Sequence, residues 1–293
     1  MKGIILSGGS GTRLRPLTKV IPKPLLPVYD KPMIFYPLSL LMTAGVQDIM
    51  IITTERDLGT YRDLLGDGSS LGIHVELAVQ KEPNGIAEAL LIAEDFTAGD
   101  DAALVLGDNI LYGPGVSDAV RTAAGITEKT GHAVVFGYRV DDPRAFGVVG
   151  FDETGKPVSL TEKPAHPESD YAVIGVYFYD GRAAGIAKTL TPSGRGELEI
   201  TDVNKAYLGS GDLELVKLGE EAVWFDAGTF DSLVDAAESI RKREAESGDL
   251  VACPEAIAYR NGWIGKTELL AAAEAMHNSE YGKYLLRLAE EDA

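Results

Sequence analysis

The first 23 residues of the chain constrain its fold more than any other stretch. Residues 4–6 (IIL) form a short apolar run typical of a buried parallel strand, and they lead into the small-residue loop SGGSGT at 7–12. Three glycines let such a loop approach a ligand closely and point several backbone N–H groups into one concavity, which suits phosphate oxygens. Residues 1–32 hold one acidic side chain, Asp30, and six basic ones, which are Lys2, Arg13, Arg15, Lys19, Lys23 and Lys31. The segment therefore predicts a strand followed by a loop that binds a polyanion.

Two common phosphate-binding motifs do not fit this loop. A dinucleotide fingerprint that starts at Gly9 would need a third glycine at position 14, which is Leu14. A Walker loop would need lysine and then serine or threonine after Gly11, which is followed by Thr12 and Arg13. The missing third glycine argues against a nicotinamide-dependent dehydrogenase.

Charge and cysteine content exclude several classes of protein. The 293 residues include 27 Lys and Arg against 45 Asp and Glu, which gives a formal net charge of −18. A field of that sign repels nucleic acid and anionic membranes, so we expect neither as a partner. Cys253 is the single cysteine, so no intrachain disulfide and no multi-thiolate zinc site can form. The chain has no signal-like start and no apolar run of membrane-spanning length, and we expect a cytoplasmic protein.

The pattern between residues 32 and 106 alternates between helices and strands. Helices are expected at 32–45, 56–65 and 84–96, and strands at 48–54, 74–80 and 102–106. This alternation at short spacing predicts a parallel sheet covered by helices on both faces. Ligands of such sheets lie beyond the carboxyl ends of the strands, where the glycine loop, Gln80 and Asp108 fall.

The second half of the chain is richer in strands. Strands are expected at 133–140, 146–152, 156–164 and 171–180, with a further strand end at 221–229. Helices are expected at 199–209 and 230–247 and over the last forty residues from Pro254. The sequence therefore predicts an α/β fold with a mixed, mainly parallel sheet in a Rossmann-like three-layer arrangement and a helical C-terminal appendage.

Several blocks of the sequence together resemble one enzyme family. LSGGSGTRLRPLT at 6–18, followed by PKPLLPVYDKPMIFYPL at 22–38, is similar to the signature of the sugar-1-phosphate nucleotidylyltransferases. The blocks VLGDN, SLTEKP, GELEITDVN, WFDAGT and VACPEAIAYR recur in the family's order, and the similarity is to the branch that uses dTTP and glucose 1-phosphate. The resemblance implies a catalytic domain over 1–240, with a nucleotide-binding half at 1–130 and a sugar-binding half at 131–228, and a helical interface or regulatory segment over 241–293. It also implies a homotetramer.

Attack of a sugar phosphate on the α-phosphorus of a nucleoside triphosphate needs charge and positioning more than a general base. The attacking phosphate has a second pKa of about 6 and is mostly ionised at neutral pH. Basic side chains and a carboxylate-bound cation would neutralise the charge that develops on the reacting centre and the pyrophosphate. Arg13 offers a planar fork for phosphate oxygens and Lys23 a mobile point charge, and the resemblance implies that both line the triphosphate.

Two carboxylates at expected strand ends are the candidate metal ligands. Asp108 follows an apolar strand and Gly107, and Asp226 precedes Gly228 near another strand end. Mg²⁺ binds through one or two carboxylates together with substrate phosphates. The resemblance implies that both residues bind Mg²⁺, although this chain has Ala227 where threonine is expected.

The remaining candidate residues divide between the nucleotide and the sugar phosphate. By resemblance, the nucleotide contacts are Leu6, Gly8, Gly9, Gly11, Thr12, Arg13, Lys23, Gln80, Gly85 and Asp108, with Gln80 and Gly85 reading the pyrimidine edge. The resemblance implies that the sugar phosphate contacts are Gly147, Glu162, Lys163, Val173, Tyr177 and Arg195, and that Lys163 joins Arg13 and Lys23 as a catalytic residue. Thymine and uracil differ by one methyl group, which is worth only about 1 to 3 kcal/mol, so UTP use is also expected.

The resemblance further implies a second nucleotide-sugar site at a subunit interface, where dTDP-rhamnose inhibits. It is formed by residues 112–118 and the block at 251–260, and Arg260 would face the diphosphate. A helix that merely packs against its neighbour explains the same block equally well. Two other functions stay open at this point, a uridylyltransferase for glucose 1-phosphate and a noncatalytic nucleotide-sugar sensor.

Overall fold

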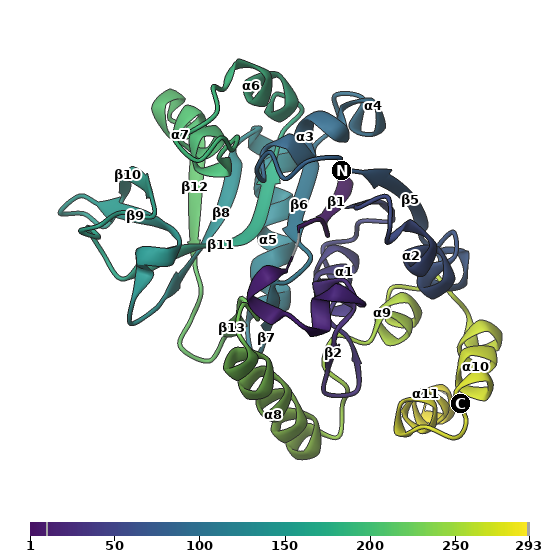
Figure 1. Cartoon of the computed structure of the whole chain (residues 1–293). Coiled ribbons are helices and arrows are strands. Elements are labelled where there is room, and N and C mark those ends of the chain that lie inside the picture. Colours follow the sequence, from purple (N-terminus) through teal and green to yellow (C-terminus); the bar gives the residue numbers. More distant parts are fainter. Residues whose placement is uncertain (10, 292–293) are drawn as a thin grey trace.

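The computed structural model describes residues 1–9 and 11–291, and Figure 1 shows one mixed sheet with helices on both of its faces. Within these residues the sheet has nine strands, and its main path is β10-β9-β11-β6-β1-β4-β5. The strands of this path are β1 (Lys2–Leu6), β4 (Asp48–Thr53), β5 (His74–Val79), β6 (Ala102–Leu106), β9 (Gly147–Phe151), β10 (Pro157–Glu162) and β11 (Tyr171–Tyr179). Off this path, β8 (Ala133–Arg139) pairs with β11, and β12 (Leu213–Lys217) pairs with β8.

The sheet divides into a parallel and a mainly antiparallel part. Strands β6, β1, β4 and β5 run parallel, so their carboxyl ends share one edge. Strand β11 is antiparallel to β6, β8 and β9, and β9 is antiparallel to β10. The expected mixed, mainly parallel sheet of the nucleotidyltransferase fold is confirmed, and its two parts form one continuous layer.

Alternating strand residues build a core on each face. Ile5 and Ile51 pack into one cluster with α1 (Phe35–Thr43), α5 (Val116–Thr130), α9 (Pro254–Arg260) and α11 (Glu280–Glu291). Ile4 and Ile52 point to the other face, where they pack with α3 (Glu88–Ile92), α6 (Ala183–Thr189) and α7 (Ile200–Ser210). The apolar strands are therefore buried on both faces, as the parallel pattern requires.

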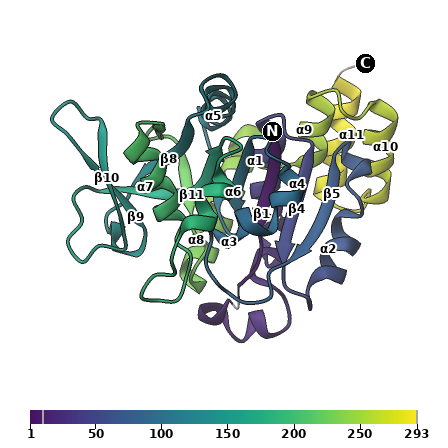
Figure 2. The same ribbon diagram turned by 90° about the horizontal axis from the view of Figure 1, so that it is seen from above.

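The remaining elements lie around this sheet. Figure 2 shows the C-terminal helices, which include α10 (Lys266–Ala275), beside β5 and the β9/β10 pair at the opposite end. Two small ribbons are formed by β2 (Pro27–Val28) with β3 (Lys31–Pro32), and by β7 (Ile110–Tyr112) with β13 (Val223–Phe225). The other helices are α2 (Leu58–Leu65), α4 (Glu94–Thr97) and α8 (Phe230–Ser247). No helix of the described residues is both long enough and apolar enough to cross a membrane.

Three of the expected helices differ from those observed. The helix expected at 84–96 is reduced to α3 and α4, because the chain before it pairs with Leu198: the Leu198 N–H donates to Asn84 O (2.6 Å) and the Ala87 N–H donates to Leu198 O (3.1 Å). The helix expected from Pro32 begins at Phe35, since Lys31–Pro32 belongs to β3, and the one expected from Arg56 begins at Leu58. The sequence did not predict helices α5 and α6 or strands β2, β3, β7 and β12.

Candidate active site

Two adjoining cavities lie at the carboxyl ends of β1 and β6. The first, here called the glycine-loop cavity, has a volume of about 340 Å³, and its lining includes Leu6, Gly8, Gly9, Gly11, Thr12 and Lys23. The second, here called the β11 cavity, has a volume of about 480 Å³, and its lining includes Gly147, Glu162, Lys163, Val173, Tyr177 and Arg195. Arg13, Ile86, Leu106 and Asp108 line both. The two cavities thus separate the candidate nucleotide residues from the candidate sugar residues and meet at Arg13 and Asp108.

The glycine loop has the backbone conformation that its composition suggests. Gly9 and Gly11 have φ angles of 106° and 53°, in the region that side chains disfavour. A Cβ on Gly11 would lie 2.9 Å from the Thr18 methyl carbon, and the Thr18 hydroxyl donates to the Gly11 carbonyl oxygen (2.7 Å). Glycine is therefore required at position 11 for close packing of the loop. Ser10 lies outside the described residues.

Lys23 contacts both candidate metal-binding residues. Its ammonium donates to Asp108 Oδ2 (2.6 Å) and to the Asp226 backbone oxygen (2.9 Å), and its side chain is only 12% exposed. Asp226 Oδ1 accepts from the Gly228 N–H (3.1 Å), and a Cβ on Gly228 would lie 3.0 Å from both terminal nitrogens of Arg13. The structure thus brings Arg13, Lys23, Asp108 and Asp226 together from four separate segments.

The residues at this junction fit a hard divalent cation. Asp108 and Asp226 both line the β11 cavity and offer carboxylate oxygens, the ligands that Mg²⁺ prefers. Groups of three or more His, Cys, Asp and Glu that could hold a metal by themselves are absent from the part of the chain that the structure describes. A two-carboxylate site suits an ion that also takes phosphate oxygens and water as ligands.

Asn109 is a buried residue of the junction that sequence reasoning missed. Its Nδ2 donates to Asp108 Oδ1 (3.2 Å), and its Oδ1 accepts from the Gly175 N–H (3.0 Å) and from Trp224 Nε1 (2.7 Å). The Trp224 ring in turn meets the Phe146 ring edge-on at 5.1 Å. Asn109 therefore fixes the Asp108 carboxylate opposite Lys23 and holds one wall of the β11 cavity.

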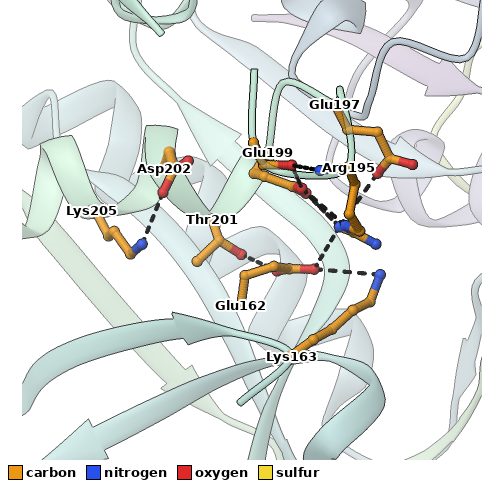
Figure 3. Close-up of polar contacts among 9 residues, drawn as sticks. Glu162, Lys163, Arg195, Glu197, Glu199, Thr201, Asp202 and Lys205 are labelled. Atoms are coloured by element: carbon orange, nitrogen blue, oxygen red, sulfur yellow. Dashed lines mark hydrogen bonds and ion pairs between the residues drawn. The ribbon is translucent and has the colours of Figure 1, made fainter. Parts of the chain in front are cut away.

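Glu162 is the centre of a polar network on the wall of the β11 cavity (Figure 3). Its carboxylate accepts from the Thr201 hydroxyl (2.5 Å) and lies 3.6 Å from the Lys163 ammonium. The guanidinium of Arg195 lies 3.4 Å from Glu162 and donates to both oxygens of Glu199 (2.8 and 2.7 Å). This bond to Glu199 raises the pKa of Arg195. Arg195 thus lies in the cavity where the sequence predicts it, with its charge already shared by carboxylates.

The backbone candidates lie beside this network. Gly147 pairs with Glu162 of β10 and with Val173 of β11, and a Cβ on Gly147 would lie 3.0 Å from the Thr201 hydroxyl oxygen. Tyr177 is buried below them, and burial together with the charge of Glu162 raises the pKa of its phenol. Gly147 therefore leaves room that a side chain would fill.

Gln80 and Gly85 lie outside the linings of these two cavities. Gln80 Nε2 donates to Glu88 Oε2 (2.7 Å) and to the Gly85 carbonyl oxygen (3.2 Å), and a Cβ on Gly8 would lie 2.8 Å from Gln80 Oε1. The Gly85 backbone has a φ of 107° and packs against Leu198. The two residues are adjacent, as base recognition would need, but the amide of Gln80 is already bonded within the protein.

A smaller cavity of about 190 Å³, here called the C-terminal cavity, lies elsewhere on the molecule. Its lining includes Tyr112, Gly113, Val116 and Ser117 together with Cys253 and Arg260. The guanidinium of Arg260 lies 3.4 Å from Asp249 Oδ1 and 3.3 Å from the Tyr284 hydroxyl. The structure therefore brings the segment after Asp108 to the block at 251–260.

Comparison with known proteins gives a consistent result. The model of a family described as nucleotidyl transferase matches residues 2–243. Glucose-1-phosphate thymidylyltransferase of Xanthomonas campestris pv. campestris is 51% identical over 292 residues, which cover all of this chain and 98% of the relative. The enzyme of the same name from Mycolicibacterium smegmatis is 49% identical over 292 residues, with full coverage of both chains.

Solved structures agree with this result. A Bacillus anthracis protein assigned as a glucose-1-phosphate thymidylyltransferase, solved with sucrose, has a TM-score of 0.76 and 42% identity over 82% of this chain and 95% of its own. A UDP-glucose pyrophosphorylase solved with UDP-glucose has a TM-score of 0.73 at 23% identity over 83% of this chain and 98% of its own, which shows a shared fold. Fold, cavities and sequence similarity over the full length together show that this chain belongs to the nucleotidyl transferase family.

Proposed function

We propose that this protein transfers a thymidylyl group from dTTP to α-D-glucose 1-phosphate, giving dTDP-glucose and pyrophosphate. The observation that carries the proposal is the meeting of two cavities at Arg13 and Asp108, with phosphate-type residues in one and Glu162 and Lys163 in the other. Relatives of this name that are about half identical over the full chain support the choice of substrates.

The reaction is a displacement at the α-phosphorus. An oxygen of the sugar phosphate forms the new P–O bond, the bond to the β-phosphate oxygen breaks, and the electron pair leaves with pyrophosphate. Lys163 holds the sugar phosphate at the junction, while Arg13 and Lys23 neutralise charge on the α-phosphate and the leaving group. Glu162 accepts hydrogen bonds from the sugar hydroxyls. The hydrogen bond that the Thr201 hydroxyl donates to Glu162 fixes the orientation of this carboxylate.

Asp108 and Asp226 would hold Mg²⁺, which supplies Lewis-acid stabilisation of the phosphate oxygens when bound. Lys23 now donates to Asp108 Oδ2, and its ammonium would be displaced from that oxygen by a bound cation. The ammonium would then be available to the α-phosphate. Base recognition would need the Gln80 amide to give up its hydrogen bond to Glu88 or to Gly85 and to form one with the pyrimidine instead.

The test measures pyrophosphate release with Mg²⁺ and glucose 1-phosphate, using dTTP, UTP, ATP, CTP and GTP in parallel. We expect fast release with dTTP and slower release with UTP. Preference for UTP would favour the uridylyltransferase instead. Absence of release with any nucleotide from folded protein would favour a nucleotide-sugar sensor. The product dTDP-glucose would enter dTDP-rhamnose or other deoxysugar synthesis. The protein itself would act in the cytoplasm as a homotetramer.

A second candidate function is inhibition by a dTDP-linked sugar such as dTDP-rhamnose at the C-terminal cavity. The joint lining of that cavity by residues after Asp108 and by Arg260 favours it. We expect Arg260→Ala to abolish inhibition by dTDP-rhamnose while pyrophosphate release without inhibitor continues. Unchanged inhibition would count against this second site.

A further inference from the structure

A third cavity, of about 690 Å³, lies at the carboxyl ends of β1, β4 and β5 and is here called the basic cavity. Gly9 lines both this cavity and the glycine-loop cavity, so the two are neighbours along one edge of the sheet. In Figure 2 the purple segment after β1 projects beyond this edge. The lining of the basic cavity includes one acidic side chain, Glu82, and four cationic ones, which are Arg15, Lys19, Arg56 and Lys81.

Three of these cations have no acidic partner. Arg56 is paired with Asp57 (2.7 Å), whereas Arg15, Lys19 and Lys81 form no ion pair with any residue that the structure describes, and all three are exposed. By contrast, Lys23 at the junction and Lys163 and Arg195 in the β11 cavity are each within 4 Å of a carboxylate, and Arg13 is the cation of the candidate site that forms no ion pair among the described residues. The mouth of the basic cavity is therefore a positive region on a chain whose net charge is −18.

That contrast matters for a highly charged substrate. The average field of this protein repels a nucleoside triphosphate, so capture depends on a local region of opposite sign. Exposed, unpaired cations act over distances up to the Debye length, about 10 Å at about 0.1 M salt, without contacting the ligand in its final position. Such charges change association rates more than bound-state affinity.

We propose that the basic cavity is an encounter site that attracts the nucleoside triphosphate and passes it across Gly9 into the glycine-loop cavity. This inference rests on the proposed function, because it takes the incoming anion to be the nucleotide. Arg15, Lys19 and Lys81 act before binding is complete, whereas Arg13 and Lys23 act on the bound triphosphate.

Stopped-flow association of a ribose-labelled fluorescent dTTP with the full chain tests the proposal. Mg²⁺ is present and sugar phosphate is left out, so that no transfer occurs. The test variant carries Arg15→Gln, Lys19→Gln and Lys81→Gln. The control carries Lys129→Gln, Lys156→Gln and Lys266→Gln, which remove the same charge from exposed lysines of α5, the turn before β10 and α10. Association is followed from about 0.01 to about 1 M salt, where the Debye length falls from about 30 to about 3 Å.

We expect the test variant to associate about 10-fold more slowly than wild type at low salt and equally fast at high salt. Its dissociation rate should match that of wild type, and the control should keep most of the wild-type association rate. Equal slowing in both variants would mean that only net charge matters and would overturn the proposal. A faster dissociation with unchanged association would also overturn it, since the residues would then hold the bound nucleotide. If wild type fails to bind the labelled dTTP at all, the proposed function itself fails.

Discussion

Lys163 is held in a backbone conformation that its side chain disfavours. Its φ is 44°, in the left-handed region that favours glycine, and its N–H donates to the Phe146 carbonyl oxygen (2.9 Å). Strained residues persist where the surrounding structure fixes them, and they gather at functional sites. The turn after β10 therefore keeps the Lys163 ammonium at the β11 cavity at some cost in stability.

Two substitutions of Lys163 separate its charge from its backbone. Lys163→Ala and Lys163→Gly both remove the ammonium, so we expect both to lower kcat/KM for glucose 1-phosphate by about 100-fold. Lys163→Gly also relieves the strain and should be more stable than Lys163→Ala by about 1 kcal/mol. Pyrophosphate release and urea unfolding measure the two effects. Wild-type turnover by the alanine variant would remove Lys163 from the proposed mechanism.

Asn109 gives a second test, because its amide nitrogen and its amide oxygen bond to different partners. Asn109→Asp keeps an acceptor for Gly175 and Trp224 but replaces the donor to Asp108 with a repelling carboxylate, so we expect a changed Mg²⁺ requirement. Asn109→Leu leaves the Gly175 and Trp224 N–H groups without an acceptor, and we expect a loss of about 2 to 3 kcal/mol in unfolding free energy. Mg²⁺ titration of activity and urea unfolding distinguish these effects. Similar behaviour of the two variants would mean that Asn109 acts only through packing.

At the scale of elements, an ion pair connects the β2/β3 hairpin to α8. The hairpin follows Lys23 in the chain, and α8 follows Asp226. Lys31 is 3% exposed, and its ammonium lies 2.5 Å from Asp30 Oδ1 and 3.0 Å from Glu244 Oε1. Glu244 also accepts from the Val251 N–H (2.8 Å). The segments that supply Lys23 and Asp226 are thus joined at the junction and again at this buried ion pair.

Removal of the Lys31 ammonium should strongly destabilise the folded protein near neutral pH. Lys31→Met leaves the buried Glu244 carboxylate without its cation, and we expect a loss of about 3 kcal/mol in unfolding free energy. The matched control, Lys205→Met, breaks an exposed pair with Asp202 and should cost less than about 1 kcal/mol. The double variant Lys31→Met/Glu244→Gln should recover part of the loss, and failure to do so would mean that Glu244 is not the strained partner.

The same pair predicts a pH dependence. Burial raises the pKa of Glu244 above its ordinary 4.5, although Lys31 opposes the rise. A raised carboxyl pKa adds stability that is fully present below 4.5 and is lost as the pH rises through the folded value. Without Lys31 that pKa rises further. The difference between wild type and Lys31→Met should therefore shrink as the pH falls toward 4.5 in urea unfolding, and a constant difference would contradict this account.

Sequence patterns predicted elements best where local periodicity and burial agree. The strands at 102–106 and 133–140 and the helix at 230–247 were found for this reason, and the apolar spacing at 116, 120, 123 and 124 would also have revealed α5. The helix expected at 84–96 failed because Asn84 and Ala87 pair with Leu198, a distant residue that no local pattern indicates.

The candidate site shows the same limit. Arg13, Lys23 and Asp108 could be predicted to converge, because strand ends and charge place them at one edge. The roles of Asn109 and Thr201 could not, since their hydrogen bonds join segments that meet only in the folded chain. The charge of Arg195 also could not predict that its guanidinium donates to Glu199.

At the scale of the whole molecule, the C-terminal segment shares its core with the sheet. Buried residues of α9 to α11, among them Ala258, Leu269 and Leu285, belong to the same cluster as Ile5 and Ile51. Asn261 Nδ2 donates to the Met42 carbonyl oxygen (3.0 Å) at the end of α1. Helix α8 continues through residue 240, so the expected boundary between a catalytic domain at 1–240 and a segment at 241–293 does not coincide with a break in the structure. The boundary stays a proposal about function.

Truncation tests whether the first part of the chain folds alone. A chain that ends at residue 248 keeps all of α8 but loses every helix after it, and the apolar face of the sheet and α1 would then meet water. Burying one large aliphatic side chain is worth about 1.5 to 3 kcal/mol, so the loss of several is comparable to the usual stability of a domain, about 5 to 15 kcal/mol. We therefore expect the truncated chain to aggregate or to lack a cooperative thermal transition in circular dichroism, beside the full chain in the same buffer. A cooperative transition close to that of the full chain would show instead that the C-terminal helices are a separable module, and their cavity with Arg260 could then change without affecting the junction at Asp108.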